Sequence, residues 1–330
     1  MKTKIKPFFA SACIVALGLL NTGCGSKSEP IVTNVPESEN LIFTPEGRLF
    51  ITGGSNVFEV IKKQDGTYEK LDMFHQNCLV EGLIQRHNYI YAVCSKTNFS
   101  DFLDSYLLGA KLSDSTPTES DLVEPGDHGG FKHPTMEIQE ITTLDDLGVP
   151  NGMEVDEFGH VYIADSGTGT IFQIDFDSPT QVNRITPWAE KISPFVNGLE
   201  WVGDELYFTG FRTGTLKSIL AKVQRNPDGS AGEVTILMER LATVLDDIAH
   251  FEGGIIVTDY VKGTLLFWHD GNVVYETESD TFFAPTAVLP GKAPMFDEDA
   301  FLVTEKGIIF NGNPRIGNQL GLFYPRLPLN

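Results

Sequence analysis

A short pattern of residues recurs along the chain and constrains its fold more than any other feature. Each copy contains a short apolar strand, an acidic or glycine-containing turn, a stronger apolar strand, a glycine-rich turn and a third strand. The copies cover residues 41–62, 78–112, 151–175, 197–219, 246–268 and 285–310, of which the second is looser and the last is degraded. Self-similarity at such a spacing predicts an array of equivalent supersecondary units.

Each unit is a meander of β-branched and aromatic residues with period-two alternation, and it cannot bury both of its faces alone. Radial stacking around an axis buries those faces and leaves only short edges, and a spacing of roughly 40 to 50 residues favours blades over a twisted sandwich. We therefore predict an all-β fold, a six-bladed β-propeller with four-stranded antiparallel blades around a central channel. The longest gap between copies contains residues 113–140, which we interpret as a surface insertion over one end of the propeller.

The composition agrees with one large folded unit. The chain has 330 residues, of which 41% are hydrophobic and 11% aromatic, so it can bury a sizeable core. Its formal net charge of -21 argues against a nucleic-acid partner, because phosphate binding needs clustered Lys and Arg. The same charge disfavours docking of the folded body on anionic lipid.

The N-terminal residues have the pattern of an export signal. A basic start at Met1–Lys6 precedes the apolar run Pro7–Leu20, which is too short to span a bilayer comfortably. The stretch that ends in Gly23-Cys24-Gly25 resembles a bacterial lipobox, in which the Cys is diacylated, although Asn21 stands where Leu is usual. Cleavage by an ordinary signal peptidase is the alternative.

These features predict three segments. They are a lipoprotein signal peptide at 1–23, a flexible tether at 24–37 that begins with lipidated Cys24, and the propeller at 38–330. The expected location is outside the cytoplasm, with the lipid holding the protein to a bacterial membrane on the periplasmic or outer face.

Two cysteines remain in the predicted folded part, Cys78 and Cys94. They bracket two apolar runs joined by a polar stretch, so a hairpin would bring them onto neighbouring strands. A disulfide is the first interpretation, and two buried free thiols are the alternative, because an oxidising compartment permits the bond without requiring it.

Four of the repeated units begin with an oxygen-bearing side chain just before the apolar strand. These residues are Glu39, Asn151, Asn197 and Asp246. The first strand of each blade lines the channel of a propeller, so these side chains should converge on the axis from different blades. Carboxylate and amide oxygens without matching Cys or His form a hard site that suits Ca²⁺ and not Zn²⁺.

At these residues the chain resembles the paraoxonase and SMP-30/gluconolactonase superfamily of calcium-dependent hydrolases. The resemblance runs from about residue 36 to the C-terminus and rests on Ser38–Ile51, Pro150-Asn151, Asn197–Trp201 and Asp246–Ile248. It implies that Glu39, Asn151, Asn197, Asp246 and Asp247 bind a catalytic calcium. Asp247 stands where paraoxonases usually have Asn, and its extra charge could tighten the ion or weaken its pull on substrate.

The resemblance also implies a chemistry. The calcium polarises the carbonyl or phosphoryl oxygen of a small ester, lactone or organophosphate while a base activates water. By analogy with SMP-30 proteins, Asp246 is the candidate base or nucleophile, and His75 and His133 are candidates by position only, since each is more often a surface His.

Two other functions stay open. One is a non-catalytic, metal-stabilised propeller that binds a partner or glycan, and the other is a strictosidine-synthase-like propeller that needs no calcium for chemistry. The sequence carries no signal of the oligomeric state.

Overall fold

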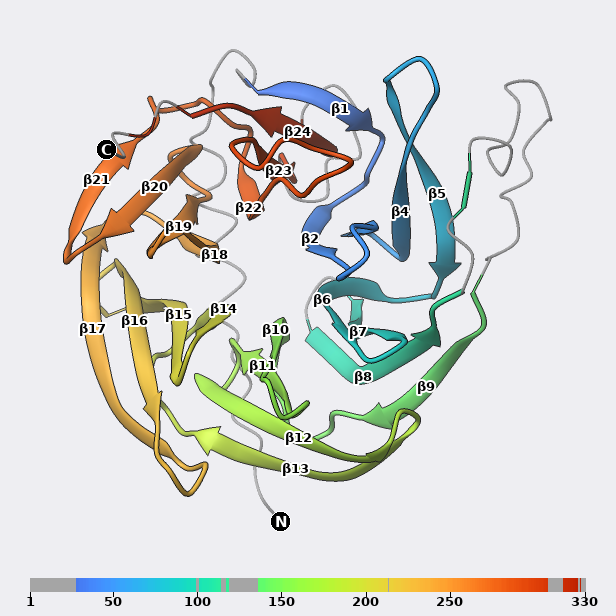
Figure 1. Cartoon of the computed structure of the whole chain (residues 1–330). Coiled ribbons are helices and arrows are strands. Elements are labelled where there is room, and N and C mark those ends of the chain that lie inside the picture. Colours follow the sequence, from blue (N-terminus) through green and yellow to red (C-terminus); the bar gives the residue numbers. More distant parts are fainter. Residues whose placement is uncertain are drawn as a thin grey trace.

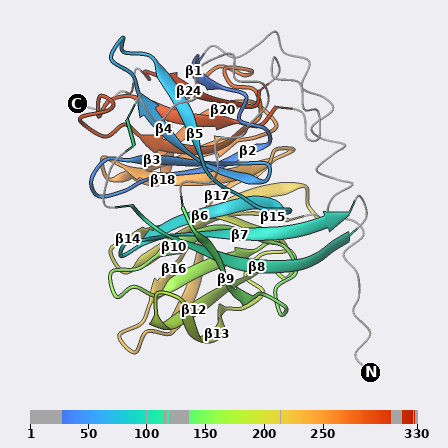
Figure 2. The same ribbon diagram turned by 90° about the vertical axis from the view of Figure 1, so that its right-hand side faces the viewer.

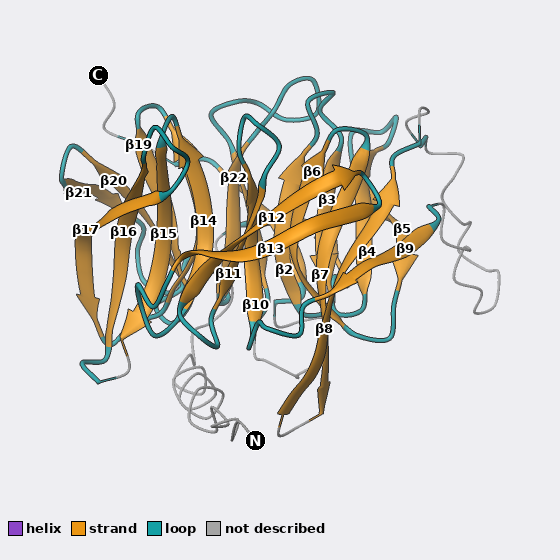
Figure 3. Ribbon diagram, turned by 90° about the horizontal axis from the view of Figure 1, so that it is seen from below, coloured by secondary structure: helices purple, strands orange, loops and turns teal. Residues whose placement is uncertain are grey.

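Six antiparallel sheets arranged around one axis make up the protein (Figure 1). The computed structural model describes residues 28–98, 101–113, 117–118, 136–212, 214–307, 317–325 and 327. The regular elements in these ranges are all strands, β1 to β24, and each sheet has four of them (Figure 3). The all-β, six-bladed propeller predicted from the repeats is therefore confirmed.

The strands of each blade follow in order from the axis to the rim. Blade 1 contains β2 (Ser38–Phe43), β3 (Leu49–Gly53), β4 (Asn56–Lys62) and β5 (Tyr68–His75). Blade 2 contains β6 (Leu79–Arg86), β7 (Tyr89–Asn98), β8 (Asp101–Lys111) and β9 (Ile138–Thr143). Blade 3 contains β10 (Pro150–Val155), β11 (Val161–Asp165), β12 (Thr170–Ser178) and β13 (Gln181–Ala189).

The other half of the ring has the same order. Blade 4 contains β14 (Val196–Val202), β15 (Glu205–Arg212), β16 (Lys217–Arg225) and β17 (Ala231–Leu241). Blade 5 contains β18 (Leu245–Phe251), β19 (Gly254–Asp259), β20 (Thr264–His269) and β21 (Asn272–Glu276). Blade 6 contains β22 (Pro285–Pro290), β23 (Phe301–Glu305), β24 (Gln319–Phe323) and β1 (Glu29–Thr33).

Blade 6 is completed by both ends of the chain. Strand β1 pairs antiparallel with β24, with Pro30 opposite Gly321 and Thr33 opposite Gln319 (Figure 1). Val35 is fully buried, and its N–H donates to the main-chain oxygen of Asn318 over 2.8 Å. The tether predicted at 24–37 is therefore wrong from β1 onward, because these residues belong to the propeller.

Burial explains which sequence patterns form which strands. The second strand of a blade packs against neighbouring blades on both faces, and all five residues of β3, β11 and β23 are buried. The rim strand β21 instead alternates between exposed and half-buried residues. A view turned by 90° shows the strands crossing the disc from one face to the other, so their ends lie at its two faces (Figure 2).

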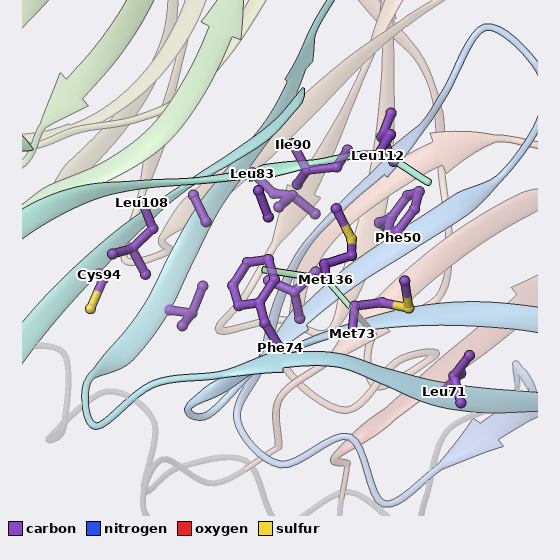
Figure 4. Close-up of a cluster of buried hydrophobic side chains, with 14 of the residues drawn as sticks. Phe50, Leu71, Met73, Phe74, Leu83, Ile90, Cys94, Leu108, Leu112 and Met136 are labelled. Carbon is purple, nitrogen blue, oxygen red and sulfur yellow. The ribbon is translucent and has the colours of Figure 1, made fainter. Parts of the chain in front are cut away.

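Hydrophobic side chains fill the space between adjacent blades. The cluster between blades 1 and 2 includes Phe50, Phe74, Leu83 and Leu108, all at most 3% exposed (Figure 4). At its edge, Cys78 and Cys94 form a disulfide with 5.6 Å between their Cα atoms. This is the pairing that the hairpin pattern favoured over two free thiols.

The insertion predicted at 113–140 lies mostly outside the described residues. Its last residues, from Ile138, belong to β9, the rim strand of blade 2. The long connection therefore lies within blade 2, between its third and fourth strands. The predicted signal peptide and Cys24 are also outside the described residues, and no described helix is long and apolar enough to cross a membrane.

Candidate functional site

A bulge interrupts each of the six inner strands near its start. In β2, Ser38 pairs with Gly53, yet the next paired residue is Leu41, opposite Ile51, so one extra residue is accommodated on the inner strand. The same shift occurs in β6, β10, β14, β18 and β22. A bulge redirects side chains, and its repetition in all six blades aligns one polar position around the axis.

The first bulge residue of each blade belongs to this common position, and together we name these residues the ring. The ring is Glu39, Glu81, Asn151, Asn197, Asp246 and Thr286. Four of its members are the residues that the sequence singled out before the apolar strands. Asp247, the fifth predicted ligand, is the next residue of the blade 5 bulge.

Sequence reasoning missed Glu81. It lies in Val80-Glu81-Gly82-Leu83, which has the same form as Val196-Asn197-Gly198-Leu199 in blade 4. The sequence therefore carries the same pattern in blade 2. It was missed because the loose second copy was taken to begin at Cys78, so Glu81 was not aligned with the polar residues of the other copies. The side chain of Glu81 is buried, as are those of Glu39 and Asp246.

Lys306 is the second residue that the sequence did not indicate. It follows β23 directly, and its ammonium contacts the Glu39 carboxylate in an ion pair at the axis. Only 9% of Lys306 is exposed. Tyr260 holds the corresponding position after β19 in blade 5 and donates from its hydroxyl to the main-chain oxygen of Gly307 over 3.1 Å.

A second group of carboxyls lies on the same inner strands. It consists of Glu154 on β10, Glu200 on β14 and Asp247 on β18, all half-buried. The main-chain N–H of His250 donates to Glu200 Oε1 over 3.2 Å, so Glu200 reaches across to β18. With Glu39, Glu81 and Asp246 in the ring, six carboxyls line the described part of the channel.

Burial and mutual repulsion shift Glu81, Asp246 and the second group of carboxyls toward their neutral forms. Burial first, and then the charge of Glu39, raise the pKa of Glu81 to about 8 and that of Asp246 well above its usual value. Burial is also the largest cause for the second group, with the pKa of Asp247 and of Glu200 each raised to about 8. The pKa of Glu154 rises because of burial and the nearby Glu200.

Lys306 responds in the opposite sense. Burial alone would lower the pKa of its ammonium, but the carboxylates of Glu39 and Glu81 outweigh burial and raise it. Lys306 therefore stays positively charged inside the channel. In the ring itself, Asn197 Nδ2 also donates to Asp246 Oδ1, which fixes the orientation of that carboxyl.

Threonine hydroxyls hold the main chain of the ring. Thr304 in β23 accepts the N–H of Ala287 in its own blade over 2.8 Å and donates to the main-chain oxygen of Glu39 in the next blade over 3.0 Å. The same two-sided contact is made by Thr52, Thr209 and Thr258. Each of these hydroxyls links one inner strand to the inner strand of the following blade.

Glycine follows the ring residue in three blades because adjacent inner strands approach closely there. A Cβ on Gly198 would lie 2.6 Å from the Cα of Asp247, and a Cβ on Gly82 or Gly152 would overlap the main-chain oxygen of the next blade's ring residue. The Asn-Gly pairs at 151–152 and 197–198 thus lie within strands, where Asn supplies a polar side chain and Gly supplies space.

His75, one of the two candidate histidine bases, lies away from the channel. His75 ends the rim strand β5, is exposed, and contacts Asn56 Oδ1 through its Nδ1. Its candidacy as a base is therefore wrong, since a rim strand holds it away from the ring. His133 lies outside the described residues.

The donor set is suited to a hard cation, with one exception. Each blade carries one carboxylate, amide or hydroxyl oxygen at its ring position, and oxygens of these kinds are the ligands that Ca²⁺ prefers. Within the described residues no three His, Cys, Asp or Glu side chains already stand in a metal-binding arrangement. The exception is Lys306, whose ammonium pairs with Glu39, a predicted ligand.

Comparisons with known proteins identify the fold. No family model and no curated protein matches the sequence. Among solved structures, the luciferin-regenerating enzyme is 13% identical with a TM-score of 0.62, over 89% of this chain and 92% of that one. Regucalcin from Agrobacterium tumefaciens, a calcium-binding protein, is 14% identical with a TM-score of 0.60, over 92% and 95%.

A protein described as a gluconolactonase gives a similar result. It is 10% identical with a TM-score of 0.60, over 92% of this chain and 94% of that one. At such low identities the agreement concerns the arrangement of the strands. The chain therefore has the six-bladed propeller fold of the SMP-30 and gluconolactonase-like structures.

Proposed function

We propose that the protein hydrolyses a small lactone or ester and that the ring binds Ca²⁺. The observation that carries the proposal is the ring itself, in which one bulge per blade aligns Glu39, Glu81, Asn151, Asn197, Asp246 and Thr286 around the axis. Regucalcin and the gluconolactonase-like protein share this fold and add support from their descriptions.

The charge balance of the channel supports a bound cation. Six carboxyls face a single ammonium, that of Lys306, in the described part of the channel. Buried carboxylates are costly unless they are paired or coordinate a metal. A divalent ion among the oxygens of the ring would let these groups ionise together.

Glu39, Glu81 and Asp246 would hold the ion together with the side-chain oxygens of Asn151 and Asn197. When bound, calcium supplies a Lewis acid that polarises the carbonyl oxygen of the substrate. Asp246, a ring carboxyl whose pKa burial raises, would accept the proton of the attacking water. Asn197 keeps that carboxyl oriented through its hydrogen bond.

The test begins with calcium binding. Calorimetry on chelator-stripped protein should show one Ca²⁺ site that Glu39→Gln and Asp246→Asn each remove. Asp270→Asn is the matched control, because the side chain of Asp270 is 90% exposed and lies in the turn between β20 and β21. Absence of binding in the wild type would overturn the calcium-dependent mechanism and favour a propeller of the strictosidine-synthase-like kind.

Activity is tested separately. A panel of γ- and δ-lactones, aryl esters and phosphotriesters is assayed with Ca²⁺ and with chelator. Turnover that requires Ca²⁺ and falls at least a hundredfold in Asp246→Asn supports the proposed reaction. Calcium binding without turnover of any compound would instead favour a metal-stabilised binding propeller.

A further inference from the structure

We propose that Lys306 is the resident cation of the ring and that a divalent cation enters only by displacing its ammonium from Glu39. The identity of that cation rests on the proposed function. The placement of Lys306 does not, because it follows from contacts within the chain. The proposal makes Lys306 a competitor for the ion, built into the same channel.

The ammonium occupies the ring in a specific way. It pairs with Glu39, the ring residue of blade 1, although Lys306 itself belongs to blade 6. The side chains of Lys306 and Glu39 are only 11% and 8% exposed, so water screens the pair poorly. An ion bound by Glu39 would sit next to this ammonium, and repulsion between the two cations would force one of them out.

Hydrogen bonds fix the main chain around Lys306, so the contact of its side chain with Glu39 follows from a defined backbone position. The N–H of Lys306 donates to the oxygen of Ala284 over 3.1 Å, and that of Gly307 to the oxygen of Phe283 over 3.0 Å. Tyr260 adds its hydroxyl hydrogen bond to Gly307. These contacts anchor the main chain of Lys306 to Tyr260 of blade 5 and to the residues just before β22 of blade 6.

The arrangement has two consequences that can be measured. Without metal, the ring keeps one compensated carboxylate, so the fold does not depend on an added ion. With metal, part of the binding free energy is spent on breaking the Lys306–Glu39 pair, so the affinity for Ca²⁺ is lower than that of the same ring without the ammonium.

The experiment compares Lys306→Met with the wild type in the full chain. Met keeps an apolar stem of similar length and removes the charge. Calorimetry with Ca²⁺ alone should show at least tenfold tighter binding in Lys306→Met. Lys217→Met, which breaks a surface pair with Glu239, is the control and should leave the affinity unchanged. Equal or weaker binding in Lys306→Met would overturn the displacement.

Thermal melting in the presence of chelator tests, without any metal, whether Lys306 is the cation of the ring. Lys306→Met should melt below the wild type, because Glu39 loses its partner, and the double variant Glu39→Gln/Lys306→Met should melt above Lys306→Met. Equal melting temperatures for the wild type and Lys306→Met would contradict the proposal. If no variant binds Ca²⁺, the calcium function fails, and the melting comparison still decides whether Lys306 is the cation of the ring.

Discussion

Thr52 Oγ1 donates a hydrogen bond of 2.9 Å to the main-chain oxygen of Glu81, one blade further around the axis. The same hydroxyl accepts the N–H of Asn40 in its own blade, also over 2.9 Å. The main chain that carries each such ring residue is thus positioned partly by the preceding blade. A substitution in one blade should therefore disturb the main chain of the ring residue in the next blade.

Thr52→Val should lower the free energy of unfolding by about 1–3 kcal/mol, because the isosteric change leaves the partly buried N–H of Asn40 and the buried oxygen of Glu81 without their partner. Urea unfolding measures the loss. Thr235→Val, on the exposed face of the rim strand β17, should change stability by less than about 0.5 kcal/mol. Equal stability of Thr52→Val and the wild type would show that the hydroxyl bridge contributes nothing.

Gly198→Ala should destabilise the protein by about 1–3 kcal/mol, because its Cβ would press against Asp247 and neither inner strand can move without disturbing its bulge. Gly214→Ala is the matched control, since a Cβ there meets no atom within 4 Å. Denaturant midpoints of the two variants test the claim that Gly198 is required for space. A neutral Gly198→Ala would contradict it.

The raised pKa of Glu200 predicts a dependence of stability on pH. Its folded pKa is about 8 against an ordinary value of 4.5, so the folded protein holds a proton that the unfolded chain releases. Stability in chelator should therefore fall as pH rises from 4.5 through 8. Urea midpoints across this range should fall less steeply in Glu200→Gln, although some slope remains because the pKa of Asp247 is also about 8.

The control for this measurement is Glu233→Gln, an exposed position on β17, which should reproduce the slope of the wild type. A Glu200→Gln protein with an unchanged slope would mean that the channel carboxyls do not govern the titration. Saturating Ca²⁺ should flatten the slope as well, if the proposed ion favours the ionised carboxyls.

Lipidation of Cys24 remains a prediction from its sequence context. In a bacterial host fed labelled palmitate, the wild type and Cys13→Ser should take up label and Cys24→Ser should not. Label retained in Cys24→Ser would overturn the assignment. Since β1 begins at Glu29 and an extended residue spans at most about 3.6 Å, a lipid on Cys24 would hold the propeller within roughly 20 Å of the membrane.

The periodic part of the fold could be predicted because every copy of the repeat obeys the same burial rule. The ring residues Glu39, Asn151, Asn197 and Asp246 were found for the same reason, since each is the polar residue before an apolar inner strand. Glu81 obeys this rule too and was missed only through the alignment of the loose second copy.

Lys306 and β1 illustrate what local patterns leave out. Lys306 meets Glu39 across 267 positions of sequence, and its copy of the repeat is degraded, so no neighbouring residue indicates its partner. Strand β1 lies within residues 25–37, a stretch rich in Ser, Pro and Glu, and its pairing partner β24 is nearly the whole chain away. Contacts between residues so far apart in sequence form when the ring closes. A local stretch of sequence holds only one of the two partners, so it cannot predict them.

The pairing of β1 with β24 determines when the ring can close during synthesis of the chain. A chain made from its N-terminus contains Glu29–Thr33 before any other described strand, yet their partner β24 is made only after blades 1 to 5. Until then the ring stays an open arc with one unpaired strand at its start. Synthesis of β24 is therefore the event that closes the ring, and a chain that stops before Gln319 leaves β1 without its pairing partner in blade 6.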